Sequence, residues 1–147
     1  MKKATPLITF HFQTYCTLAN RKKLRELIIA TFKKYKTPAS SLNIVFCTDE
    51  FLLDINRNYL KHDYYTDIIT FDLAEPGSPV EGEIYISIDR VKENAQAEKV
   101  SITHELHRVI FHGVLHLCGF TDKSAADKAK MTEQENRLLH SYLSRST

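Results

Sequence analysis

The chain has few cysteines and lacks a long apolar run. Its three cysteines, Cys16, Cys47 and Cys118, are odd in number and widely spaced among 147 residues. This spacing argues against a disulfide framework and predicts free thiols in a reducing cytoplasm. No apolar segment approaches the roughly 20 residues that cross a bilayer. The first residues are basic but lack an apolar stretch and a small-residue cleavage site, so we expect no signal peptide and no membrane partner.

The length and composition are those of an ordinary globular protein. A chain of 147 residues that is 43% hydrophobic and 26% charged suits one domain over residues 1–147 with a sizeable core. The net charge of +2 hides an asymmetry, because residues 1–36 hold nine Lys and Arg against one acidic residue. Such a segment can contact phosphates, but on its own it is more simply explained as a solvated helix face.

Hydrophobic periodicity predicts four strands and five helices. Apolar residues alternate in the strands and recur at helical spacing elsewhere. Thr48 is expected to cap the second helix, and Ser124 the last one. We read residues 74–82 as a loop. The result is an α+β fold, a small mixed β-sheet of four strands packed against five helices. The strands are expected near 8–12, 42–46, 67–73 and 83–88, and the helices near 24–35, 49–59, 89–99, 102–118 and 124–144.

The most informative segment reads H-G-V-L-H-L-C-G-F-T-D and runs from His112 to Asp122. His112 and His116 are four residues apart, so on a helix they share one face. Gly119 is suited to the left-handed conformation that ends helices, and the turn lets Asp122 approach the two imidazoles. Two imidazoles and a carboxylate suit Zn²⁺ and leave a fourth position for water, as in catalytic zinc sites. The pattern predicts one zinc ion per chain.

The alternative is that the two histidines belong to the core. Apolar residues surround them on nearly every side of the expected helix, so the helix should be buried. Buried imidazoles without partners are costly, and a metal ion removes that cost. We therefore favour the metal site. Cys118 lies about 200° around the helix from His116, so we do not expect it to join the ligands.

The same segment resembles the signature of the YbeY family of single-strand-specific endoribonucleases. Three further stretches are similar to family blocks: Glu105-Leu-His107, Asn56–Phe71 with its Thr66-Asp67 pair, and Gly82–Ser87. The resemblance implies a zincin-like metal helix and a metal-dependent enzyme. It also implies action on single-stranded ribosomal RNA, in 16S rRNA 3′-end maturation and ribosome quality control. The small ribosomal subunit is then the expected partner, and DNA is not.

The chain departs from the family pattern at three places. Asp122 and Thr121 stand where the family usually has His and Asp, and a carboxylate is an acceptable zinc ligand. Leu60 replaces an Arg thought to assist catalysis. The adjacent Lys61 and His62 are our candidate catalytic residues, because either can carry positive charge toward a phosphate. Tyr65 replaces a Pro.

Two other functions were weighed against the endoribonuclease. The spacing of the ligands also suits a zincin metalloprotease, but Gly113 occupies the position of the glutamate that serves as general base. A non-enzymatic ribosome-assembly factor with a structural zinc normally needs four protein ligands, and the sequence offers three. We therefore expect an endoribonuclease. The basic N-terminal helix could track the RNA strand, and Tyr64 or Tyr65 could stack on bases or simply pack.

Overall fold

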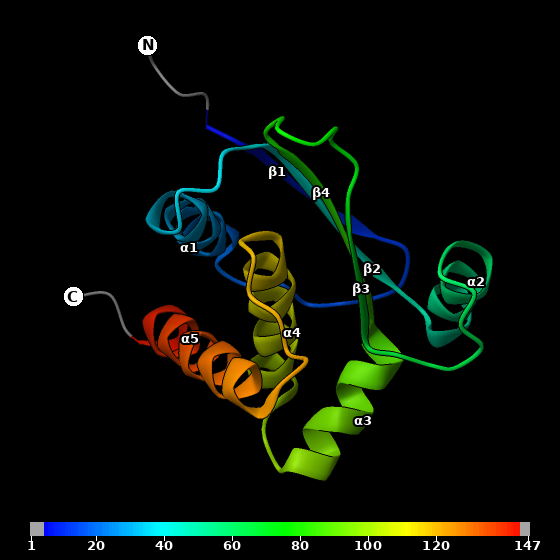
Figure 1. Ribbon diagram of the computed structural model, residues 1–147. Coiled ribbons are helices and arrows are strands. Elements are labelled where there is room, and N and C mark those ends of the chain that lie inside the picture. Colours follow the sequence, from blue (N-terminus) through cyan, green and yellow to red (C-terminus); the bar gives the residue numbers. More distant parts are fainter. Residues whose placement is uncertain (1–4, 145–147) are drawn as a thin grey trace.

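The computed structural model describes residues 5–144, which form five helices and four strands (Figure 1). Their order, β-α-β-α-β-β-α-α-α, confirms the predicted α+β arrangement. The strands are β1 (Leu7–Phe12), β2 (Ala39–Cys47), β3 (Ile68–Asp72) and β4 (Val80–Ser87). The helices are α1 (Arg21–Lys34), α2 (Asp49–Tyr59), α3 (Ile88–Glu98), α4 (Ile102–Leu117) and α5 (Ala125–Leu143).

The four strands make one mixed sheet in the order β1-β2-β4-β3. β1, β2 and β4 are parallel neighbours, whereas β3 pairs antiparallel with β4. Parallel neighbours need a crossover connection, and α1 provides the one between β1 and β2. Figure 1 shows α1, α4 and α5 on one side of the sheet and α2 on the other.

The larger core lies between the sheet and α4. Leu42, Ile44 and Ile84 of the central strands are fully buried there, together with Ile110 and Val114 of α4. A smaller cluster of Cys47, Leu52, Ile55 and Ile69 packs α2 against the opposite face. The two central strands are therefore covered on both sides, and the edge strand β3 is left beside α4.

Strand β4 begins earlier than the sequence predicted. We expected a loop over residues 74–82, but Val80 already pairs with Ala39, and Gly82 pairs with Leu42 and Asp72. The predicted loop over residues 74–82 is therefore wrong at its end, where Gly82 belongs to the strand. A Cβ atom at this position would lie 2.8 Å from Leu117 Cδ1. The glycine therefore permits the end of α4 to pack closely on the strand.

A second glycine has the same effect inside α4. A Cβ atom at Gly113 would lie 2.8 Å from Ile84 Cδ1 and 2.9 Å from Ile68 Cδ1. The helix is thus held against β3 and β4 at a distance that a larger residue would disturb. Within residues 5–144, none of the helices has the length and apolarity to span a membrane.

Candidate metal centre

His112, His116 and Asp122 converge at the end of α4. The two histidine Nε2 atoms are 3.0 Å apart. Asp122 Oδ2 lies 3.5 Å from His112 Nε2 and 3.7 Å from His116 Nε2. One potential ligand atom from each residue lies within 4.8 Å of the others, and Cys118 is not part of this group. The structure therefore brings together the three residues that the sequence singled out.

The turn after α4 explains why Asp122 reaches the histidines. Gly119 has φ of +99°, the left-handed conformation that glycine adopts without strain. Its N–H donates to the His116 carbonyl at 3.0 Å, and the Phe120 N–H donates to the Leu115 carbonyl at 3.0 Å. This pair of hydrogen bonds is the Schellman motif. It reverses the chain and directs the next residues back over the last turn of α4.

Hydrogen bonds at the other ring nitrogens define the chemistry of the two imidazoles. His112 Nδ1 is 2.6 Å from Glu135 Oε2, and His116 Nδ1 is 3.0 Å from the Phe120 carbonyl oxygen. Carboxylate and carbonyl oxygens accept, so both Nδ1 atoms carry the proton and donate. Burial, and then the neighbouring His112, lower the pKa of His116, which favours its neutral form. In a neutral ring with its proton on Nδ1, Nε2 is the nitrogen that can offer a lone pair to a metal.

Three potential electron-pair donors that converge in this way are suited to share a cation. Ligands that share one tetrahedral zinc at its usual bond lengths stand roughly 3.3 Å apart. The separations of 3.0, 3.5 and 3.7 Å bracket that value. The donor set of two neutral imidazoles and one carboxylate thus fits a divalent metal ion.

The three candidate ligands line an open groove of about 580 Å³ between α4 and β3. Asp67, Asp72 and Asp122 place three carboxylates along it, and within residues 5–144 no lysine or arginine lines it. Burial raises the pKa of Asp67 above its usual value. The raised pKa favours the neutral form of Asp67, so the groove presents three carboxyl groups and, within residues 5–144, no lysine or arginine to offset those that are ionised.

The two candidate catalytic residues lie in different places. His62 lines the groove, where its Nδ1 is 3.0 Å from the Tyr64 hydroxyl and the two rings stack. Lys61 is not among the lining residues, and its Nζ donates to the Asn58 carbonyl at 3.5 Å. Leu60 also lines the groove, at the position where the family pattern has Arg.

The two tyrosines proposed for base stacking also differ in position relative to the groove. Tyr64 lines the groove and is 56% exposed. Tyr65 does not line it, and its hydroxyl donates to Glu50 at 2.6 Å, while the Arg90 guanidinium lies over its ring. Tyr64 is thus available to a ligand in the groove, whereas Tyr65 packs against α2 and α3.

The structure argues against the metalloprotease alternative, because position 113 has neither the catalytic glutamate nor free space for its side chain. Gly113 stands where a zincin has its catalytic glutamate. Its missing Cβ would contact the side chains of Ile84 and Ile68 at less than 3.0 Å. A glutamate there would force the Ile84 and Ile68 side chains to move.

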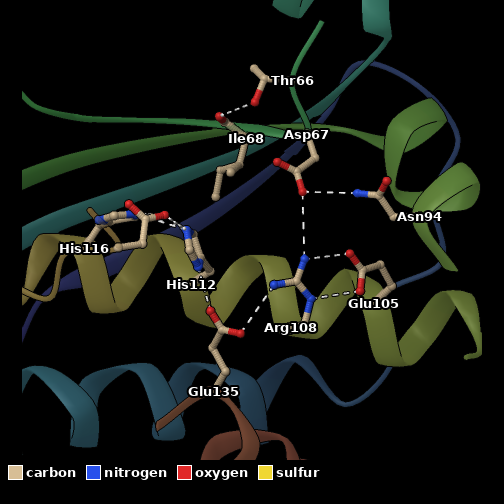
Figure 2. Close-up of polar contacts among 10 residues, drawn as sticks. Thr66, Asp67, Ile68, Asn94, Glu105, Arg108, His112, His116 and Glu135 are labelled. Atoms are coloured by element: carbon tan, nitrogen blue, oxygen red, sulfur yellow. Dashed lines mark hydrogen bonds and ion pairs between the residues drawn. The ribbon is translucent and has the colours of Figure 1, made fainter. Parts of the chain in front are cut away.

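The sequence did not reveal the charged residues that surround His112. Glu135 is 4% exposed and contacts His112, and Arg108 Nη1 lies 3.3 Å from the other oxygen of Glu135 (Figure 2). A signal was present: Glu135 shares the buried stripe of α5 with Met131, Leu139 and Tyr142. An acidic residue in an apolar stripe needs a partner, but the stripe does not say which one.

The basic N-terminal segment lies away from the groove. Arg21 and Arg25 stack over Phe12 and Phe10, and Lys23 Nζ donates to the Ser144 carbonyl at 2.6 Å. None of the described lysines or arginines of α1 lines the groove. The remaining basic residues of this segment include Lys2 and Lys3, which lie outside the described residues. A role for α1 in RNA contact therefore stays a prediction.

Comparisons with known proteins agree with this geometry. Residues 8–143 match the family described as Endoribonuclease YbeY. The chain is 46% identical over 139 residues to Endoribonuclease YbeY of Cytophaga hutchinsonii, an alignment that covers 95% of this chain and 96% of the relative. It is 44% identical over 119 residues to Endoribonuclease YbeY of Parabacteroides distasonis, covering 81% and 83%.

A solved structure has the same fold. The solution structure of TM1509 from Thermotoga maritima superposes with a TM-score of 0.60 at 25% identity, and the match covers 92% of this chain and 88% of that one. The family match spans almost all of the described residues, including the three that converge at the end of α4. The chain therefore belongs to the YbeY family of endoribonucleases, which are hydrolases.

Proposed function

We propose that this protein is a zinc-dependent, single-strand-specific endoribonuclease that acts in ribosomal RNA maturation, at the 3′ end of 16S rRNA, and in ribosome quality control in the cytoplasm. The observation that carries the proposal is the convergence of His112, His116 and Asp122 in an open groove of a chain whose relatives are named endoribonucleases. The substrate is single-stranded RNA, presented on the small ribosomal subunit.

The three residues would hold one Zn²⁺ ion. A zinc ion in such a site lowers the pKa of water to about 7 and polarises a phosphoryl oxygen. The side chains of His116 and Asp122 are 31% and 45% exposed, so a polymer can reach them. Structural zinc sites are closed by four protein ligands. Three ligands in an accessible groove favour an enzyme over an assembly factor whose metal only stabilises the fold.

The groove offers RNA little fixed positive charge. His62 is the lining residue that can become cationic toward a phosphate, and Tyr64 offers an exposed ring for base stacking. The carboxylates of Asp67 and Asp72 repel a phosphodiester until a divalent cation offsets them. RNA binding, like RNA cleavage, should therefore depend on the metal.

The direct test combines metal analysis with a nuclease assay. The purified protein is expected to hold about one zinc per chain and to cut single-stranded RNA, with loss of cleavage in a chelator. His112→Ala, purified identically, should lose cleavage and keep its fold, because only one ligand on the groove side of α4 is removed. Equal RNA cleavage by both proteins would overturn the assignment. Metal-dependent cleavage of a peptide would favour a protease, and bound zinc without any cleavage would favour an assembly factor.

The family difference at Leu60 offers an independent test. Leu60 lines the groove and is 39% exposed, so an arginine has room to extend into it. Leu60→Arg should raise the cleavage rate if a positive charge at this position stabilises the transition state. Leu60→Met serves as the matched control for side-chain length without charge. An equal rate in Leu60→Arg and the parent would mean that charge at this position does not assist the reaction.

A further inference from the structure

A partly buried network of charges, with Glu135 and Glu105 at its buried positions, reaches His112 from α5. Glu135 Oε2 contacts His112 Nδ1 at 2.6 Å, and its other oxygen lies 3.3 Å from Arg108 Nη1. Arg108 also holds Glu105 through two hydrogen bonds of 2.9 and 2.7 Å. Its Nη2 lies 3.9 Å from Asp67, which accepts from Asn94. Figure 2 shows this chain of contacts from His112 to the wall of the groove.

We propose that Glu135 is a positioning residue for His112. It fixes the imidazole with its proton on Nδ1, so that the Nε2 lone pair faces the metal position, and Arg108 holds Glu135 in place. The proposal rests on the proposed function in one respect, that His112 is a metal ligand. It assigns roles to two residues, Glu135 and Arg108, that lie outside the group of ligands.

The geometry places a proton on His112 Nδ1. An ionised carboxylate only accepts, and the Arg108 guanidinium only donates. Each oxygen of Glu135 therefore receives one hydrogen bond, from His112 on one side and from Arg108 on the other. Which nitrogen of an imidazole carries the proton is set by the partner of the other nitrogen. Glu135 thus determines the state of an Nε2 atom that it does not touch.

Glutamine at position 135 gives the sharpest test, because it has nearly the same shape. An amide has one accepting oxygen and one donating nitrogen, so it cannot accept from both neighbours. The charged Arg108 should take the oxygen, since hydrogen bonds with an ionised partner are the stronger ones. The amide nitrogen then faces His112 Nδ1, and the imidazole must move its proton to Nε2, where it blocks the metal.

The fold should survive this change. Arg108 keeps its two hydrogen bonds to Glu105 when Glu135 loses its charge, so no buried cation is left without a partner. Glu133 of the same helix is the matched control. It is 59% exposed and pairs with Arg137 at 3.2 Å, so Glu133→Gln removes the same charge from α5 without touching His112.

The experiment reads the protonation of the ring nitrogens directly. In the metal-free protein, ¹⁵N NMR of the imidazoles should show His112 with its proton on Nδ1 in the parent and in Glu133→Gln, and on Nε2 in Glu135→Gln. Zinc affinity, measured by competition with a chromophoric chelator, should fall roughly 10- to 100-fold in Glu135→Gln, as for other groups that orient metal-binding histidines. Glu133→Gln should stay within twofold of the parent.

The outcomes separate this proposal from the proposed function. A parent His112 that carries a proton on Nε2 and none on Nδ1 would overturn the positioning role without any variant, and so would an unchanged His112 in a folded Glu135→Gln. A parent that binds zinc but cuts no RNA would contradict the proposed function and leave the role of Glu135 supported. A parent that binds no zinc would refute the metal site, and the NMR result would still decide what Glu135 does to His112.

Discussion

Helix α4 carries four histidines, and three of them, His107, His112 and His116, occupy two contrasting environments. His107 is 1% exposed and stacks on the Tyr142 ring at a centroid distance of 4.0 Å, and its Nδ1 donates to the Thr103 carbonyl. Among the described residues, no polar atom is within hydrogen-bonding distance of its Nε2. His112 and His116 also have a hydrogen-bonded Nδ1, but their Nε2 atoms face each other and Asp122. The difference lies in what Nε2 faces.

The rotation of the helix produces this separation. Residues 107 and 112 are about 140° apart around an α-helix, whereas residues 112 and 116 are about 40° apart. His107 therefore points into the core, and the other two point into the groove beside β3. A histidine count along the chain would treat the three alike. Their helical phase places one in the core and two in the candidate metal centre.

The largest expected effect lies on the groove side. Asp122→Ala should weaken zinc binding by roughly 100-fold or more, beyond the loss that follows from removing a group that only orients a ligand. Asp122→His should retain the site, because imidazole is an equally good zinc ligand. Chelator competition measures both. If Asp122→Ala bound zinc with the affinity of the parent, Asp122 would not be a ligand. The candidate site would then consist of His112 and His116.

The core side should show the reverse behaviour. His107→Ala is expected to lower the free energy of unfolding by about 2–4 kcal/mol, as for buried side chains of similar size, and to leave zinc affinity within about twofold. Denaturant unfolding in the presence of a chelator measures the first, and chelator competition the second. A large loss of zinc affinity in a folded His107→Ala would break the division of α4 into two sides.

Acid should expose the same difference. Burial lowers the pKa of His107 below its usual 6.5, so the unfolded chain takes up a proton more readily than the folded one. The contribution of His107 to stability is complete above about pH 6.5 and falls as the pH drops toward its lowered folded value. His107→Phe should therefore lose less stability between pH 7 and pH 5 than the parent, both measured without metal. His140→Gln, on the exposed face of α5, is the control and should behave as the parent.

The smallest effect is expected on the basic helix α1. If Lys22, Lys23, Lys33 and Lys34 contact phosphates, changing them to alanine should flatten the salt dependence of RNA binding by up to about 0.7 in slope for each lost contact. Changing Lys92 on α3 and Lys128 on α5 to alanine is the control, because each substitution removes one positive charge outside α1. A slope identical to that of the parent would identify α1 as a solvated face, and cleavage chemistry would then be confined to the groove.

The features that the sequence predicted correctly are contacts between residues that are close together along the chain. The caps at Thr48 and Ser124 accept from Phe51 and Asp127 as expected. The convergence of His112, His116 and Asp122 follows from helical spacing and one glycine turn. Each of these contacts joins residues within about ten positions, where backbone geometry leaves few alternatives.

The parts that were missed join distant segments. Glu135 and His112 are on different helices, and Arg108 approaches Asp67 from another element. Periodicity shows that Glu135 is buried but not what it faces, because helix packing decides the partner. Gly82 was misread for a related reason. The absence of a side chain at Gly82 admits Leu117 of α4, whereas composition alone placed the residue in a loop.

The compact turn at Gly119 also affects how metal and folding are linked. All three candidate ligands fall within an eleven-residue segment, and bringing together the ends of so short a segment costs an unfolded chain less entropy than closing a longer loop. The unfolded protein therefore keeps part of the affinity for zinc. A ligand stabilises a fold only by its preference for the native state. Excess zinc should raise the melting temperature of this protein by less than its native-state affinity alone implies.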